Sequence, residues 1–129
     1  METISGGRRW AGRVLSGMAV AFLLVDAAGK LLRVQPVVEG SMQLGYPATT
    51  VVPVGVLLLV GVALYVVPRT SVLGAIWLAA YLGGAVATHV RVGNPLASHV
   101  LFPVYVAAFV WGGLALRNPR LMALLTRGQ

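Results

Sequence analysis

The sequence predicts an all-α, four-helix transmembrane bundle with both chain ends in the cytoplasm. Two observations carry the fold class: 58% of the 129 residues are hydrophobic and only 10% are charged, with the apolar residues gathered into four long stretches. Mean hydropathy is +0.86. A soluble domain of this length needs a polar surface, and such domains carry about 25% charged residues. The composition therefore excludes an ordinary soluble globular domain, a disordered chain and a coiled coil.

Each of the four stretches has the length of a membrane-spanning helix, which needs about 20 apolar residues. The expected spans cover residues 13–32, 49–67, 70–90 and 98–116, within a single transmembrane domain of residues 1–129. No alternation of polar and apolar residues appears, so a transmembrane barrel is not expected. The first span follows several arginines, as a signal peptide does, but it continues past Asp26 without a cleavage motif. We therefore interpret it as a retained helix.

Proline and glycine mark the ends of these spans. Pro68 closes the second span, and residues 68–70 form a turn so short that the second and third spans become antiparallel neighbours. Residues 93–95, Gly-Asn-Pro, make the turn to the fourth span, which ends before Pro119. Pro103 lies inside the fourth span, where proline predicts a kink.

The cations predict the orientation of the bundle. Seven lie on the side that carries both chain ends: Arg8, Arg9, Arg13, Arg69, Arg117, Arg120 and Arg127. Three lie on the other side: Lys30, Arg33 and Arg91. An excess of cations marks the cytoplasmic side. We therefore expect a multi-pass protein of the cell membrane, of the bacterial inner-membrane type.

The net charge of +7 does not indicate a nucleic-acid partner. The cations are scattered singly, without a basic stripe or a nucleic-acid-binding motif, so we expect them to face anionic lipid headgroups of the bilayer. The chain has no cysteine, so in redox chemistry a cofactor or a partner protein would have to carry the electrons. Phosphate-binding loops and hydrolase motifs are also absent from the sequence.

Small residues at helical spacing predict close packing of helices. Ala80, Gly84 and Thr88 form one such line on the third span, and Gly12 and Ser16 form another on the first. In lipid, lines of this kind let helix backbones approach each other closely. Packing within one bundle is the favoured interpretation, and a homodimer contact is the alternative.

Every acid except Glu2, and both histidines, fall at the outer end of the predicted bundle. Asp26 lies about 9 Å below the end of the first helix, at 1.5 Å per residue, and a carboxylate there should face the bundle rather than lipid. Lys30 follows it by four residues, in the favoured order for a helical ion pair. The candidate acid–base residues are Asp26, His89 and His99. The candidate ligand-binding residues are Lys30, Glu39, Tyr46, Tyr81, Thr88 and Arg91.

Two interpretations of this cluster stand. The residues form either an ion-pair and hydrogen-bond network that only holds the helices together, or the lining of a cavity open toward the outer leaflet. A histidine titrates near neutral pH, so a histidine and a carboxylate in one cavity can pass protons. Metal binding is not expected, because the spacing of His89 and His99 matches no metal motif.

Four pieces of the sequence resemble the DoxX-like family of small membrane proteins. They are PVVEG with LGYPA (36–40 and 44–48), PRTSVLGAIWLAAYLGGAVATHVRVGNP (68–95), the following His99, and WGGLALRNPRL (111–121). In related sequences the first span commonly ends in SGxxKL. Here VDAAGKLLRVQP keeps Lys30 and Leu31 and places Asp26 where a small residue is usual.

The resemblance implies that this chain is a four-helix membrane protein. Some members of the family are subunits of a thiosulfate–quinone oxidoreductase or associate with redox enzymes, and more distant relatives act as assembly chaperones. Together with the polar cluster, the resemblance suggests that the protein binds a lipophilic small molecule, a quinone or an isoprenoid-like compound, as an accessory subunit beside a membrane redox partner. The first alternative is a membrane enzyme that carries out cyclisation, isomerisation or epoxide opening on an isoprenoid-like substrate, with Asp26 as the acid and a histidine, His89, as its base or relay. The second is a structural or chaperone protein.

Overall fold

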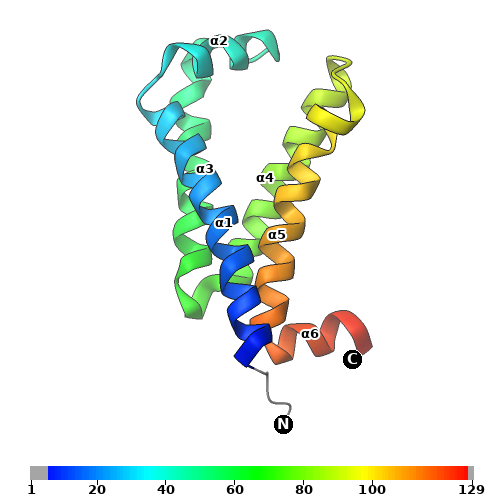
Figure 1. The fold of residues 1–129 in the computed structure, drawn as a ribbon. Helices are drawn as coiled ribbons and strands as arrows, with labels where there is room; N and C mark the ends of the chain where they lie inside the picture. The colour runs from blue at the N-terminus through cyan, green and yellow to red at the C-terminus, as the bar shows by residue number, and fades with distance from the viewer. Residues whose placement is uncertain (1–5, 128–129) are drawn as a thin grey trace.

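A computed structural model describes residues 6–127, all of them in helices or short connections (Figure 1). In chain order the elements are α1 (Gly6–Leu31), α2 (Gln35–Gln43), η1 (Ala48–Thr50), α3 (Val51–Val66), η2 (Pro68–Thr70), α4 (Ser71–Arg91), η3 (Leu96–Val100), α5 (Phe102–Arg117) and α6 (Pro119–Arg127). Four helical segments are long and apolar enough to cross a membrane, which confirms the predicted all-α bundle of four spans: Gly6–Leu31, Ala48–Val66, Pro68–Arg91 and Leu96–Arg117.

Two short helices, α2 and α6, were not predicted from the sequence. Each has a proline in its first turn, where the fixed φ of proline suits a helix start. In α6 the Oδ1 of Asn118 accepts a hydrogen bond from the Leu121 amide at 3.1 Å and caps the new helix. Both helices are too short to span the lipid bilayer, so neither has the length of apolar sequence that indicates a membrane span.

The fourth span differs from its prediction at Pro103. The sequence suggests one helix with an internal kink, whereas the chain forms a single π-helical turn, η3, and starts a new helix at Phe102. Pro103 thus lies in the first turn of α5, where its missing N–H leaves no hydrogen bond unmade.

The four long helices form a ring in which α1 packs against α3 and α5, and α4 packs against the same two helices. As predicted, α3 and α4 are antiparallel neighbours joined by η2. The start of α1, η2 and α6 lie at one end, here called the α6 end, and α2 and η3 lie at the other, the α2 end (Figure 1). The predicted cytoplasmic location of the α6 end follows from its arginines.

Glycines bring the helices closest together toward the α6 end. A Cβ on Gly12 would lie 2.7 Å from the backbone oxygen of Gly113, so α1 and α5 cross there almost backbone to backbone. A Cβ on Gly74 would lie 2.3 Å from the Tyr65 nitrogen, so α3 and α4 cross in the same way. The Gly12–Ser16 line therefore packs within the bundle.

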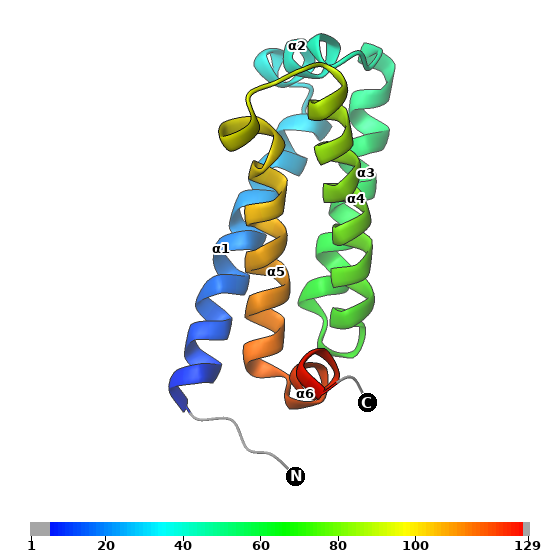
Figure 2. The ribbon, with the colours of Figure 1, turned by 90° about the vertical axis from the view of Figure 1, so that its right-hand side faces the viewer.

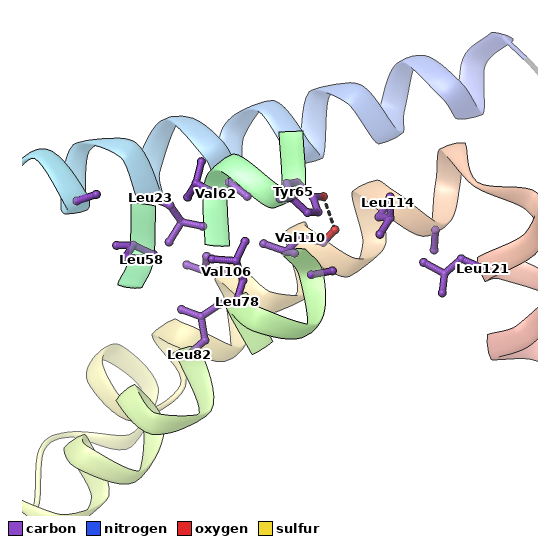
Figure 3. Packing of buried hydrophobic residues seen from close by; sticks show 14 residues of the cluster. Leu23, Leu58, Val62, Tyr65, Leu78, Leu82, Val106, Val110, Leu114 and Leu121 are labelled. Carbon is purple, nitrogen blue, oxygen red and sulfur yellow. Dashed lines mark hydrogen bonds between the residues drawn. The ribbon is translucent and has the colours of Figure 1, made fainter. Parts of the chain in front are cut away.

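A buried hydrogen-bond network joins three helices beside these crossings, and Figure 3 shows its bond between Tyr65 and Val110. The Tyr65 hydroxyl of α3 donates to the Val110 carbonyl of α5 at 2.5 Å. Ser16 of α1 therefore donates to the Tyr65 hydroxyl, at 2.8 Å. Arg117 of α5 donates to Ser16 Oγ through Nη2 at 2.9 Å, and its guanidinium lies 5.9 Å from the centre of the Tyr65 ring. This network holds the α6 end of the bundle together.

The small-residue line of α4 does not pack as the sequence suggests. Ala80 and Gly84 are exposed, and a Cβ on Gly83 or Gly84 would meet nothing within 4 Å. The pair α1 and α3 and the pair α4 and α5 separate toward the α2 end (Figure 1), and no other helix of the described chain packs on Ala80 and Gly84. The small side chains face an empty space instead.

Candidate functional site: a cavity at the α2 end

A cavity of about 440 Å³ occupies the space between the two separated helix pairs. Its floor is apolar and lies on the buried side chains of Leu23, Leu82 and Val106, which belong to the hydrophobic core (Figure 3). Six of the predicted site residues lie on its wall: Asp26, Lys30, Tyr46, Tyr81, Thr88 and His89. The topology therefore gathers polar groups from α1, α4 and the loop after α2 around one cavity.

Exposed residues of both helix pairs contribute to the cavity wall. Leu57 of α3 lines it and is 50% exposed, and Ala80 and Gly84 face it from α4 and are exposed as well. On the opposite side, Phe22 of α1 and Phe102 of α5 line it with their rings 5.1 Å apart in an edge-to-face contact. Both sets of residues belong to the membrane-spanning segments.

Asp26 and Lys30 form an ion pair on the wall of the cavity. Lys30 Nζ donates to Asp26 Oδ1 at 2.5 Å, and the side chains are 15% and 29% exposed for Lys30 and Asp26. Gly55 of α3 makes room for the lysine, because a Cβ there would lie 2.8 Å from Lys30 Cβ. Both charged residues lie on α1, so the pair itself joins no two helices.

Tyr46 closes the cavity from the loop after α2. Thr88 Oγ1 donates to the Gly84 carbonyl at 2.8 Å, so the Tyr46 hydroxyl is the donor in its 2.7 Å hydrogen bond to Thr88. Arg91 holds the same loop by donating from Nη2 to the Leu44 carbonyl at 2.5 Å. The loop turns at Gly45, whose φ of +95° is a conformation that side chains rarely adopt.

Tyr81 brings a free hydroxyl to the cavity. Its side chain is half-buried on α4, lines the cavity and has no hydrogen-bond partner within residues 6–127. A hydroxyl that lines a cavity and has no internal partner can donate a hydrogen bond to an acceptor on a bound molecule. Tyr81 is therefore a donor available to a bound molecule.

The two histidines lie together at the edge of the cavity. His89 lines it, and His89 Nδ1 lies 2.7 Å from Asn94 Nδ2, which donates to it, so in the neutral ring Nε2 carries the proton. The His99 ring contacts the His89 ring edge-to-face at 5.8 Å between centres. His99 itself is exposed and does not line the cavity; its Nδ1 is 2.8 Å from Ser98 Oγ.

The structure places two other predicted site residues away from the cavity wall. Glu39 is exposed on α2 and accepts a hydrogen bond from Gln35 at 3.2 Å. Arg91 is exposed and acts on the loop that carries Tyr46, as described above. Both lie at the predicted end of the bundle, but their helix faces, which the sequence does not specify, turn them from the cavity. In the described part of the chain no three His, Asp or Glu side chains gather as metal ligands would.

Several lining residues were missed by the sequence analysis. Ser41 and Leu44 come from α2 and the loop after it, and Thr50 lies just before α3. No polar motif marks these positions. The only available signal was the Gly-Tyr-Pro sequence at residues 45–47, which predicts a turn that folds α2 back over the bundle.

The fold and the cavity define a class: a multi-pass, four-helix membrane protein with a polar-rimmed, ligand-sized cavity near one end. Residues 14–113 match the profile of the DoxX-like family, and the chain belongs to this family. No curated protein and no solved structure gives a significant match to it.

Proposed function

We propose that this DoxX-like protein binds a lipophilic small molecule with a polar head, a quinone or an isoprenoid-like compound, in the cavity at the α2 end. It would do so as an accessory subunit of a membrane redox system, in a membrane of the bacterial inner-membrane type. The observation that carries the proposal is the cavity itself, about 440 Å³ with an apolar floor and a polar rim. Ligand sites in proteins typically have volumes of roughly 300–1,000 Å³ and this mixed lining.

The polar rim suits a head group that accepts hydrogen bonds. The Tyr81 hydroxyl is without a partner in the described chain, and the Lys30 ammonium has donors beyond the one that Asp26 uses. Quinone carbonyls are acceptors, and a prenyl tail would lie on the apolar floor of the cavity. With no cysteine in the chain, electrons would pass between the bound molecule and the partner protein.

The contacts around the cavity favour binding over a purely structural role for the cluster. Asp26 pairs with Lys30 on its own helix, and His89 pairs with Asn94 in the turn that follows its helix. Neither pair joins two long helices. Contacts between the long helices come instead from the Tyr65 network at the other end, so the Asp26–Lys30 and His89–Asn94 pairs are free to serve a ligand.

The test is binding of decylubiquinone, a short-tailed quinone, to the purified protein, followed by quenching of tryptophan fluorescence. Tyr81→Phe removes one hydrogen bond to the ligand and should raise Kd roughly three- to tenfold. Tyr105→Phe is the matched control, because its hydroxyl donates to the Ala97 carbonyl and does not line the cavity. Mass spectrometry of lipids extracted from the protein should reveal a prenylated molecule. Its absence, with no decylubiquinone binding, would refute the proposal.

A second candidate, a membrane enzyme, is favoured by the presence of Asp26 and His89 on one cavity wall. In the cyclisation of an epoxidised isoprenoid, His89 would act in its protonated form, with the Asn94 amide turned so that its Oδ1 accepts from Nδ1, and would deliver its Nε2 proton to the epoxide oxygen as the ring closes. Asp26, which the sequence suggests as the acid, is ion-paired with Lys30 and would instead accept the proton released when the alkene forms, so the product is an isomer of the substrate. Exposed His99, in contact with His89, would exchange protons with water.

Asp26→Asn separates the two candidates. Incubated with epoxyfarnesol, the enzyme should convert it to a cyclic isomer, and Asp26→Asn should lose this turnover while keeping its helical circular dichroism. Glu39→Gln, the same change on an exposed residue of α2, should leave turnover intact. If the wild type gives no isomer and still binds decylubiquinone, the binding role stands and the enzyme role fails.

A further inference from the structure

A second cavity, of about 430 Å³, lies at the α6 end, between the turn η2 and the corner where α5 meets α6. It is distinct from the site described above and lies at the opposite end of the bundle. Its wall includes two arginines and two uncharged polar residues: Arg117, Arg120, Ser71 and Asn118. The lining is therefore suited to an anion.

The positive charge of this cavity is not neutralised within the described chain. The two carboxylates that the structure describes, Asp26 and Glu39, belong to the α1–α2 region at the other end of the bundle. Arg120 is exposed and makes no hydrogen bond to another residue of the described chain. A concave site with one sign of charge concentrates ions of the opposite sign.

Hydrogen-bond donors on this wall also remain unused. Arg117 donates to Ser16 through Nε and Nη2, which leaves Nη1 available. Asn118 uses its Oδ1 as the cap of α6, so its Nδ2 amide is available as well. Guanidinium groups bind phosphate oxygens through paired, charge-assisted hydrogen bonds. The chemistry points to a phosphate-bearing ligand.

The neighbouring surface indicates where that phosphate comes from. α6 lies across the end of the bundle (Figures 1 and 2), and its Leu124 and Leu125 are 63% and 57% exposed. A short helix that exposes leucines and an arginine, here Arg120, is suited to the interface between headgroups and acyl chains. Basic pockets at the ends of transmembrane helices hold anionic lipid headgroups.

We propose that the cavity lined by Arg117, Asn118 and Arg120 binds the headgroup phosphate of an anionic phospholipid, with α6 lying on the membrane surface beside it. The bound lipid fills the corner between η2 and α6 and so ties the last helix to the bundle. This site is independent of the cavity at the α2 end and of the function proposed for that cavity.

The test is lipid binding to the protein in dodecyl maltoside, measured by native mass spectrometry with phosphatidylglycerol. Arg120→Gln should weaken binding roughly tenfold, the effect of losing one charge-assisted hydrogen bond. Arg13→Gln is the matched control: it removes the same charge from an exposed residue toward the same end that does not line the cavity. It should change binding less than twofold. Phosphatidylcholine, which has the phosphate but no net charge, should bind at least tenfold more weakly.

Each other outcome overturns the proposal. Equal losses in Arg120→Gln and Arg13→Gln would mean that diffuse charge, not a site, attracts the lipid. Displacement of the lipid by an equal concentration of inorganic phosphate would make the site one for a free anion. A photoactivatable phosphatidylglycerol on the wild-type protein gives a readout that needs no variant. It should label peptides from residues 114–125, and labelling elsewhere would refute the site.

Discussion

Replacing Gly74 by alanine tests the helix crossing that closes the α6 end of the bundle. The new Cβ would lie 2.3 Å from the Tyr65 nitrogen and 2.5 Å from its Cα. These are backbone atoms of α3, so no side chain can move aside to make room. An ordinary contact lies near 3.4–4 Å. α3 and α4 must therefore separate by about 1 Å where they cross.

The expected magnitude follows from two opposing effects. Overpacking of a well-packed contact costs about 1–3 kcal/mol. Alanine favours a helix over glycine by up to about 1 kcal/mol. Gly74→Ala should therefore lower the free energy of unfolding by about 1–2 kcal/mol. Gly17→Ala, on the exposed face of α1 with nothing within 4 Å of the new Cβ, should leave it unchanged or raise it by up to about 1 kcal/mol.

The assay is reversible unfolding of the purified protein in mixed micelles of dodecyl maltoside and dodecyl sulfate, followed by circular dichroism. The two variants carry the same substitution in transmembrane helices, so a difference of sign between them isolates the crossing. If Gly74→Ala proves as stable as Gly17→Ala, the close approach of α3 and α4 is wrong. The account of a bundle held tightly at one end and open at the other would then fail with it.

Three further substitutions probe the network and the cavity. Tyr65→Phe removes the buried hydrogen bonds to Ser16 and Val110. Such bonds average about 0.6 kcal/mol each in membrane proteins, so the free energy of unfolding should fall by about 1 kcal/mol in the same assay. No change would show that the network does not stabilise the bundle. Tyr46→Phe removes a partly exposed hydrogen bond to Thr88 and should alter the free energy of unfolding by less than about 0.5 kcal/mol. It should nevertheless speed hydrogen exchange of the backbone amides at residues 44–46. Unaltered exchange would show that this bond does not hold the loop. Gly84→Leu places a side chain in the cavity, at a position where a Cβ meets nothing within 4 Å, so the protein should still fold. Its Kd for decylubiquinone should rise at least tenfold. Tight binding by this variant would show that the ligand binds elsewhere.

The elements of the fold can be predicted from the sequence more closely than their ends. Composition and the spacing of prolines and glycines were sufficient for four spans, because hydrophobicity and turn chemistry are properties of neighbouring residues. The first helix begins at Gly6 rather than at residue 13, since arginines near a helix start do not end the helix. The break before Pro103 was expected as a kink, because proline allows both outcomes and the packing of η3 decides between them.

The site was predicted in part. Asp26 and His89 were expected at one end of the bundle, and both line the cavity there. Glu39 shares that end but faces away, because a residue in a loop helix has no helix face that the sequence specifies. The interpretation of Gly84 as a packing glycine was wrong, because a small residue permits close approach but does not require a partner helix to be there.

The sequence by itself determined that this chain crosses a membrane as four helices and that its protonatable side chains collect at one end. Both follow from the cost of placing polar groups in lipid, which is summed along the chain. Only the tertiary structure decided where the helices touch and where they part. Gly12 meets Gly113, and Tyr65 meets Ser16 and Val110, through contacts between residues far apart in sequence. Close backbone contact at one end and divergence at the other create the cavity, and this geometry depends on how distant surfaces fit together.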